Sequence, residues 1–356
     1  MVALSDHSIE MLAETLLGQG YNPRAASRVL RAYWQHDGQL DIQTVAIARR
    51  ARAFLSGRFA LRHSHVLARH RSADGTLKLL VGFASGGAVE CVLMPSHRPD
   101  RAAACISCQV GCAMGCDFCA STRGGLERNL CVGEIVEQFM HLRAQAKQQR
   151  RRIASLVFMG MGEPMHNLDH VIPAIRLLAE PGLGSLGKRA ITVSTVGIVP
   201  GIDRLARAKL GVHLALSLHA PDDPTRSRLV PSNRRWPVGE IMAAARRYQA
   251  ISGRPVNIEY CMLAGVNDSD EQARLLAELM QGFGAHVNLI PYNPIGPGIS
   301  GMIYQRPGDQ RIDRFAQMLR DQGVVVHIRQ TCGDDITAAC GQLRPVVQSW
   351  QDGQLA

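Results

Sequence analysis

The sequence predicts an α/β fold built as a full or partial (β/α) barrel, with a small helical module in front of it. Short segments rich in Val, Ile and Leu recur after residue 105, and each is separated from the next by enough chain for a helix. Before them, apolar residues at helical spacing are followed by an alternating segment around a Gly-Gly turn. The first pattern indicates a parallel sheet, and the second indicates helices and a hairpin.

The chain of 356 residues, 46% of them hydrophobic, is long enough for one large core and a smaller appendage. We expect a helical, basic accessory domain at 1–72, a β-hairpin extension at 73–100, the barrel at 101–345 and a C-terminal tail at 346–356. No apolar run reaches the roughly 20 residues that a membrane span needs, and the N-terminus lacks a signal-peptide pattern. We therefore expect a cytoplasmic protein without a membrane partner, and a monomer.

The expected elements follow in chain order. Short helices are expected from Ser8 to about Phe59, and a hairpin from Thr76–Phe83 and Ala88–Met94 around the Ser85-Gly86-Gly87 turn. The expected barrel strands are 155–159, 190–194, 212–218, 256–262, 287–291 and 324–328. Helices that would cover the barrel are expected at 132–144, 168–178, 238–251 and 269–280, and the Gly- and Pro-rich segment 296–308 is expected to be a loop. In such a barrel the carboxyl ends of the strands face the active site.

The charge of the chain favours a polyanionic partner. Lys and Arg total 40 against 30 Asp and Glu, which gives a net charge of +10. Ten arginines but only two acids, Asp37 and Asp41, lie between Gly20 and Ser72, and a second basic run covers Arg143–Arg152. These features predict an RNA-binding surface, although a merely solvated basic surface explains the charge equally well.

Six of the ten cysteines lie between Cys105 and Cys131, a clustering that indicates metal or redox chemistry in a large chain without a secretion signal. Cys112, Cys116 and Cys119 lie at C-x3-C-x2-C spacing near the start of the expected βα array. Three thiolates would leave one iron of a [4Fe-4S] cluster open to a substrate. A zinc site completed by Cys108 or a histidine is the alternative.

The spacing of these three cysteines resembles the signature of the radical S-adenosylmethionine (SAM) superfamily, whose open iron binds SAM and cleaves it to a 5′-deoxyadenosyl radical. The resemblance extends over nearly the whole chain to the RlmN/Cfr family of RNA adenine methyltransferases. It rests on the strings CISCQVGCAMGCDFC, FMGMGEP, VSTVG, LSLHAP, LIPYNP and GDDITAACGQL. It implies a partial barrel of the radical SAM type with a [4Fe-4S] cluster on Cys112, Cys116 and Cys119.

The same resemblance implies a SAM pocket at the ends of the expected strands. It places Gly162 and Glu163 at the amino group of SAM. The other implied SAM contacts are Ser194, Ser217, Leu218, His219 and Asn293. Without the resemblance, the Gly-rich turn would be an ordinary βα loop, and His219 could be a packed residue without proton chemistry.

Two further cysteines and a glutamate complete the implied mechanism. In the family, one SAM methylates a cysteine and a second SAM supplies the radical that activates this methyl group, so two SAM molecules are used per turnover. Cys340 matches the methyl-carrying cysteine, and Cys105 matches the resolving thiol that forms a transient disulfide with it. Glu90 matches the proton acceptor, although it could also be a solvent-facing strand residue. We expect Cys91, Cys131 and Cys261 to be packed as small apolar side chains.

The implied substrate is an adenosine of 23S rRNA, with tRNA as a second substrate and a flavodoxin-type protein as electron donor. We favour methylation at C2, as in RlmN, over C8, as in Cfr. One departure concerns Cys332, which stands where the family usually has an arginine near the RNA site; Cys108 is interpreted as a bystander. More distant alternatives are a radical SAM maturase and a non-catalytic RNA-binding iron-sulfur protein.

Overall fold

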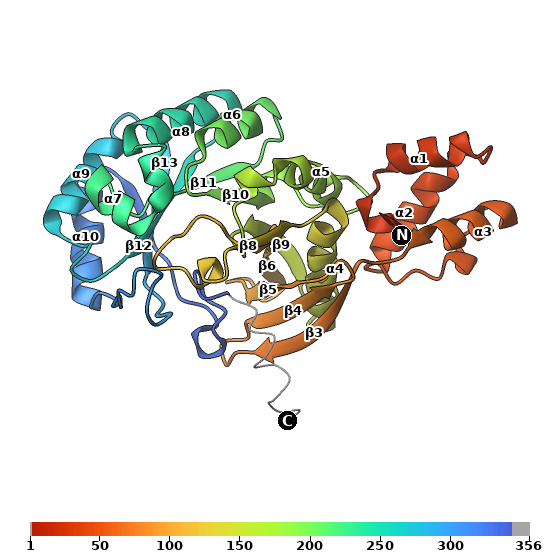
Figure 1. Cartoon of the computed structure of the whole chain (residues 1–356), viewed down its shortest axis with the longest axis horizontal. Helices are drawn as coiled ribbons and strands as arrows, with labels where there is room; N and C mark the ends of the chain where they lie inside the picture. The colour runs from red at the N-terminus through yellow and green to blue at the C-terminus, as the bar shows by residue number, and fades with distance from the viewer. Residues whose placement is uncertain (1, 344–356) are drawn as a thin grey trace.

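The computed structural model describes residues 2–343 and is dominated by one curved sheet of ten strands (Figure 1). The strand order is β14-β13-β12-β11-β10-β9-β6-β5-β4-β3. The parallel strands are β6 (Arg101–Cys105), β9 (Arg152–Phe158), β10 (Ile191–Thr195), β11 (His213–Ser217), β12 (Val256–Met262), β13 (Ala285–Pro291) and β14 (Val325–Ile328). Each strand lies beside the next one in the chain, which makes an open barrel of βα units. The expected α/β fold with a partial (β/α) barrel is therefore confirmed.

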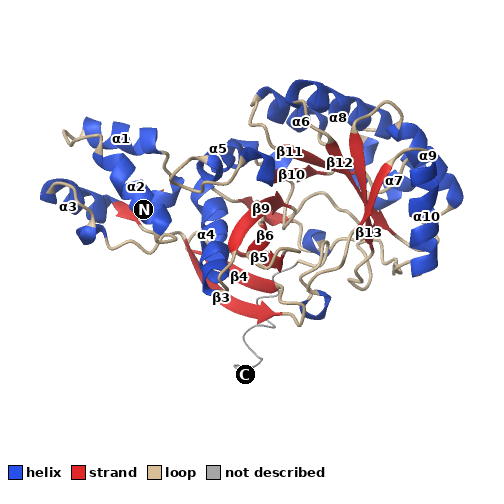
Figure 2. Ribbon diagram, turned by 180° about the vertical axis from the view of Figure 1, so that it is seen from behind, coloured by secondary structure: helices blue, strands red, loops and turns tan. Residues whose placement is uncertain are grey.

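Helices cover the outer face of the curved sheet (Figures 1 and 2). They are α4 (Val132–Gln148), α5 (Leu168–Ala179), α6 (Val199–Arg207), α7 (Asp223–Leu229), α8 (Val238–Ser252), α9 (Asp270–Met280) and α10 (Asp309–Asp321). Buried aliphatic residues of the strands and of the inward helix faces form one large core, and a smaller second cluster surrounds Phe118. The carboxyl ends of the parallel strands are left free to present polar groups.

The predicted hairpin is present as β4 (Leu77–Phe83) and β5 (Ala88–Pro95), and a further strand, β3 (Ser64–Arg71), pairs with β4. These three strands are antiparallel and extend the barrel sheet, because β5 pairs with β6. The register sets Lys78, Val92 and Cys105 side by side across β4, β5 and β6. Directly opposite residues share a face, so Glu90, two residues from Val92, lies on that face too.

The N-terminal residues form a helical module of α1 (Ile9–Gly18), α2 (Ala25–Gln35) and α3 (Arg49–Arg58), which stands beside α4 and α5 in both views. A short parallel pair, β1 (Val2–Ala3) and β2 (Phe59–Ala60), closes it. Trp34 and Tyr33 are completely buried in its core. The module is attached to the barrel through Asp37, whose carboxylate pairs with Arg143 and, at 2.6 Å, with Lys147 of α4. Two residues of the second basic run, Arg143 and Lys147, therefore form ion pairs within the protein.

The expected C-terminal tail, 346–356, lies outside the described residues. Within residues 2–343, every helix is too short or too polar to span a bilayer.

Candidate active site

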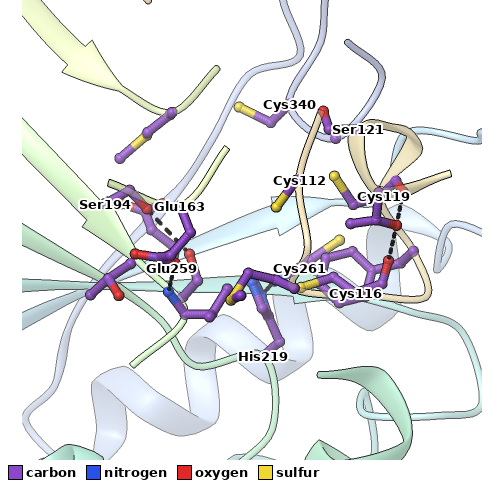
Figure 3. Close-up of a pocket in the computed structure, with 18 of the residues that line it drawn as sticks. Cys112, Cys116, Cys119, Ser121, Glu163, Ser194, His219, Glu259, Cys261 and Cys340 are labelled. Atoms are coloured by element: carbon purple, nitrogen blue, oxygen red, sulfur yellow. Dashed lines mark hydrogen bonds between the residues drawn. The ribbon is translucent and has the colours of Figure 1, made fainter. Parts of the chain in front are cut away.

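An open cavity of about 930 Å³, a figure that includes solvent at its mouth, lies at the carboxyl ends of the parallel strands (Figure 3). Its walls bring together nine of the residues predicted from the sequence, namely Cys112, Cys116, Cys119, Gly162, Glu163, Ser194, Ser217, His219 and Cys340. Segments that are far apart in the chain thus meet in one cavity, as the barrel topology requires.

The three cysteines of the C-x3-C-x2-C loop line one wall of the cavity. Burial raises the pKa of the Cys112 thiol to about 12 and also raises the pKa values of Cys116 and Cys119, so these thiols keep their protons until a metal displaces them. Cys108 directs its thiol to the Met161 carbonyl, 3.8 Å away, instead of to the cavity. Three thiol donors beside an open space fit a [4Fe-4S] cluster with one free iron position, and Cys108 does not complete a four-cysteine site.

Buried polar contacts fix this loop. The Asp117 carboxylate accepts hydrogen bonds from the Ser300 hydroxyl at 2.5 Å and from the Tyr304 hydroxyl at 2.6 Å, which ties the loop to the predicted loop 296–308. Two hydrogen bonds from residues just after Cys119 reach the segment that carries Cys340. The Ala120 amide donates to the Gly341 carbonyl at 2.7 Å, and the Ser121 hydroxyl donates to the Leu343 carbonyl at 2.6 Å. The segment of Cys340 is therefore held against the three-cysteine loop.

Arg226 is a completely buried cation near Cys116, and sequence reasoning did not select it. Its guanidinium donates to the carbonyls of Leu218 at 2.9 Å, Val196 at 2.5 Å and Ser217 at 3.2 Å. Burial lowers the pKa of Arg226 to about 10, which leaves it charged at neutral pH. It joins the ends of β10 and β11 and supplies a fixed positive charge near Cys116.

Glu163 and Gly162 follow β9 and form the next wall. The Glu163 carboxylate accepts from the amides of Val196 at 2.9 Å and Met165 at 3.0 Å, and burial raises its pKa to about 7. Gly162 has φ of +101°, and a Cβ there would lie 2.6 Å from Gln109 Cβ, so only glycine fits. A carboxylate held in this way suits an ammonium group.

The ends of β10 and β11 contribute hydroxyls and an imidazole. Ser194 Oγ and Ser217 Oγ lie 3.3 Å apart. His219 Nδ1 accepts from the Cys261 amide at 3.0 Å, its ring packs edge to face on Phe118, and its φ is +62°. Burial, and then Arg226, lower the pKa of His219 to about 3, so the ring is neutral and acts as a hydrogen-bonding and packing group.

Two predicted SAM contacts do not line the cavity. Leu218 is completely buried in the core and contributes its backbone, with its amide donating to the Glu259 carbonyl at 3.0 Å. Asn293 lies behind the wall, where its Nδ2 donates to the Cys340 carbonyl at 3.2 Å and its Oδ1 accepts from the Thr331 hydroxyl at 3.2 Å. As the structure stands, Asn293 holds the backbone of Cys340.

Cys340 lines the cavity, and Cys105, at the end of β6, is its neighbour. Burial raises the pKa of Cys105 to about 12, with a smaller contribution from Cys340. The Cys340 side chain is accessible from the cavity, yet the surrounding protein also raises the pKa of its thiol. The Arg329 guanidinium lies near both thiols and lowers the pKa of each, against the effect of burial. All ten cysteines are free, so no disulfide joins Cys105 to Cys340 in this structure.

Glu90 lies outside the cavity, on the face of β5 that continues toward Cys105. It is 1% exposed, and its Oε1 lies 2.9 Å from Lys78 Nζ. Lys78 also donates to the Thr337 carbonyl at 3.2 Å and to its hydroxyl at 3.1 Å, three residues before Cys340. Glu90 is thus a buried ion-pair member connected to the Cys340 segment, and the interpretation as a solvent-facing residue is wrong.

The cavity also contains residues that the sequence did not identify as functional. Glu259 of β12 is 3% exposed, and its Oε1 accepts from Asn288 at 2.8 Å, while its buried Oε2 has no hydrogen-bond partner among residues 2–343. Cys261, which we expected to be only a packing residue, lines the cavity as well. An acidic residue inside the apolar strand VNIEYCM was the signal for Glu259.

Comparisons with known proteins show the family of the chain. Residues 106–277 match the radical SAM superfamily. The chain is 50% identical over 342 residues to a probable dual-specificity RNA methyltransferase RlmN 1 of Opitutus terrae, with 96% of each chain covered. It is 42% identical to a dual-specificity RNA methyltransferase RlmN of Acidiphilium cryptum, covering 96% of this chain and 88% of that protein.

Among solved structures, a radical SAM methyltransferase from Sphaerobacter thermophilus superposes with a TM-score of 0.90. The two chains are 43% identical, and the match covers 97% of this chain and 99% of the other. The similarity therefore includes the N-terminal module and the antiparallel extension as well as the barrel.

Proposed function

The chain belongs to the RlmN family of radical SAM RNA methyltransferases, and on this premise we propose that it methylates C2 of an adenosine in 23S rRNA, and of a tRNA adenosine, through a methylated Cys340. The single observation that supports the covalent route is the position of Cys340. It lines the same cavity as the three cluster cysteines and has a second thiol, Cys105, beside it.

The cluster and SAM, when bound, supply the methyl group and the radical that activates it, with two SAM molecules used per turnover. We assign the cluster to Cys112, Cys116 and Cys119. The Glu163 carboxylate, beside Gly162, would accept hydrogen bonds from the ammonium of SAM. The hydroxyls of Ser194 and Ser217 offer further polar contacts. Leu218 contributes its backbone, His219 its neutral ring, and Asn293 the orientation of Cys340.

The protein's own residues carry the carbon from SAM to RNA. Cys340 holds it as an S-methyl group, which would lose one hydrogen atom to the SAM-derived radical and then form a bond to the adenine carbon, so that protein and RNA are joined. Glu90 would take the proton from that ring carbon, and the one electron left over would return to the cluster. The Cys105 thiolate then attacks the Cys340 sulfur, the carbon-sulfur bond breaks, and the carbon keeps the electron pair and is protonated to methyl. The resulting disulfide is opened by an external reductant, and a flavodoxin-type protein supplies electrons to the cluster.

The N-terminal module would provide phosphate contacts for the RNA. Eight of the ten arginines between Gly20 and Ser72 are exposed: Arg24, Arg28, Arg31, Arg49, Arg50 and Arg58 on the module, and Arg69 and Arg71 on β3. Such contacts position a nucleic acid without selecting its sequence. The adenine must leave its stack to reach the cavity, as in other enzymes that modify bases.

Anaerobic turnover with rRNA and tRNA from cells that lack this modification tests the proposal. Mass spectrometry of the nucleosides should show 2-methyladenosine in both RNAs, together with 5′-deoxyadenosine from SAM. Formation of 8-methyladenosine would replace C2 by the Cfr-type position. Failure to cleave SAM would overturn the enzymatic proposal, and turnover without methylated RNA would point to a maturase.

A further inference from the structure

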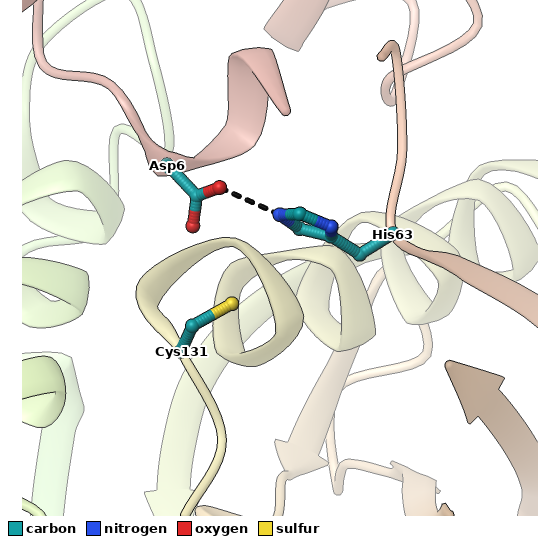
Figure 4. Close-up of side chains that lie close together, drawn as sticks. All are labelled: Asp6, His63 and Cys131. Carbon is teal, nitrogen blue, oxygen red and sulfur yellow. Dashed lines mark hydrogen bonds and ion pairs between the residues drawn. The ribbon is translucent and has the colours of Figure 1, made fainter. Parts of the chain in front are cut away.

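Asp6, His63 and Cys131 form a group of potential metal ligands far from the cavity, at the junction between the N-terminal module and the barrel (Figure 4). Asp6 ends the short 3-10 helix Leu4–Asp6, His63 lies in the connection between β2 and β3, and Cys131 precedes the first turn of α4. Cys131 was expected to be a packed apolar residue. It is instead only partly buried, and its thiol faces the imidazole of His63.

The three ligand atoms already lie at the spacing of one small site. They are all within 4.8 Å of one another, and Asp6 Oδ2 is 2.6 Å from His63 Nε2. The donor atoms of a tetrahedral zinc site are separated by about 3 to 4 Å, as follows from bonds of about 2.0 Å to oxygen and nitrogen and 2.3 Å to sulfur. Movements of less than a bond length would therefore form the site.

The backbone of α4 orients the carboxylate. The Gly133 amide donates to Asp6 Oδ1 at 2.8 Å, which leaves Oδ2 directed at His63. A Cβ on Gly133 would lie 2.8 Å from both Asp6 Oδ1 and His63 Cδ2, so the two side chains close tightly over this glycine. Outer hydrogen bonds of this kind fix the ligands of natural metal sites.

We propose that Asp6, His63 and Cys131 bind one Zn²⁺ ion, with water in the fourth position. A thiolate, an imidazole and a carboxylate are all zinc donors, whereas Mg²⁺ and Ca²⁺ prefer sites made of oxygen alone. All three residues are partly exposed, which gives the ion and its water a path to the site. This site is separate from the proposed methylation chemistry and does not depend on it.

A zinc ion here would join three segments that the chain otherwise connects only through hydrogen bonds and packing. It would fix the start of the N-terminal module and the connection to β3 against α4. Since the ion binds only the folded junction, it would stabilise the protein by mass action. The competing explanation is a His63–Asp6 ion pair with Cys131 as a bystander.

The test uses the holoenzyme with its cluster reconstituted, so that Cys112, Cys116 and Cys119 are occupied. The protein is dialysed against a chelator and then against zinc sulfate, and zinc is measured by mass spectrometry and by X-ray absorption at the zinc edge. We expect one zinc per chain with one sulfur neighbour and the rest nitrogen or oxygen. No retained zinc, or a site with several sulfur neighbours, would overturn the proposal.

Cys131→Ser is the decisive variant, because serine is a good N-cap and preserves the start of α4 while removing the thiolate. It should lose the zinc and its sulfur signal, whereas Cys332→Ala, which removes a partly exposed cysteine elsewhere, should keep both. Zinc should raise the unfolding temperature of the wild-type protein and leave that of Cys131→Ser unchanged. Equal zinc binding by both variants would mean that this group is an ordinary ion pair.

Discussion

Lys78 and Glu90 form an ion pair, Nζ to Oε1 2.9 Å, in which both side chains are at most 5% exposed. The pair lies on the sheet face shared with Cys105, and Lys78 also binds the segment before Cys340. It therefore connects the antiparallel extension with the residues that we propose to carry the methyl group.

Replacing Lys78 by Met should destabilise the protein by about 3–5 kcal/mol, because it removes the cation next to a buried carboxylate. Chemical unfolding measures this change. The double variant Lys78→Met/Glu90→Met should be more stable than Lys78→Met alone, since it removes the carboxylate as well. Equal stability of Lys78→Met and wild type would show that the pair does not hold the sheet extension.

Removing Cys105 and removing Cys340 should have opposite effects on the covalent intermediate. Cys105→Ala should accumulate a protein–RNA adduct, because no thiol resolves it, whereas Cys340→Ala should form neither adduct nor methylated RNA. Denaturing electrophoresis and intact-protein mass spectrometry detect the adduct. Cys108→Ala, which removes a buried thiol that points away from the cavity, is the control and should turn over normally. Adduct formation by Cys340→Ala would contradict the assignment.

Arg329→Met should slow resolution of the adduct at neutral pH. Arg329 lowers the pKa of both Cys105 and Cys340 against the effect of burial, so its loss leaves less thiolate at a given pH. Each unit of pKa increase removes about tenfold of the reactive thiolate, so the deficit should shrink as the pH rises. The rate at which the adduct decays in a single turnover, measured from neutral to alkaline pH, tests this prediction. Arg329→Lys keeps a cation and should retain most of the rate.

SAM binding should weaken as the pH falls below about 7, the pKa to which burial raises Glu163. A raised carboxyl pKa means that the folded protein without SAM favours the protonated form, so at low pH the ammonium of SAM loses its anionic partner. Because the pKa of Glu163 is higher in the folded protein than in the unfolded chain, its ionisation also lowers the free energy of unfolding as the pH rises through about 7. Anaerobic equilibrium dialysis should show this dependence for wild type and a flat profile for Glu163→Gln.

Glu259→Gln should weaken SAM binding by roughly 1–3 kcal/mol, because we expect Oε2, which has no hydrogen-bond partner among residues 2–343, to accept a hydrogen bond from the bound cofactor. Iron content and the visible spectrum of the cluster should stay unchanged, because Glu259 is no thiol ligand. An unchanged dissociation constant for SAM would mean that Glu259 serves the sheet through Asn288 alone.

The fold was largely predictable because local patterns encode it. All six predicted barrel strands and all four predicted helices are present with ends shifted by a few residues, since runs of branched apolar residues identify buried strands. The Lys78–Glu90 pair was not predictable, because it depends on the register between β4 and β5. A sequence pattern shows which residues of a strand are buried, but not which residues of the neighbouring strand lie opposite them.

The residues of the site could be predicted where they belong to one contiguous motif. They could not be predicted where their role depends on contacts between distant segments. The three-cysteine loop could be identified from spacing alone. Arg226 has no sequence signal, because its role depends on carbonyls at the ends of two strands. Cys131 likewise needed the folded junction, where Asp6 and His63 approach it from two other segments. Asn293 was expected to contact SAM, yet its hydrogen bonds are to the Cys340 backbone and Thr331.

The hydrogen bonds from Ala120 and Ser121 to the carbonyls of Gly341 and Leu343 hold the segment that carries Cys340 against the three-cysteine loop. If oxygen destroys the cluster and its loop loosens, the segment that carries Cys340 loses its anchor at the same time. Loss of the cluster would thus also release Cys340 from its place at the cavity.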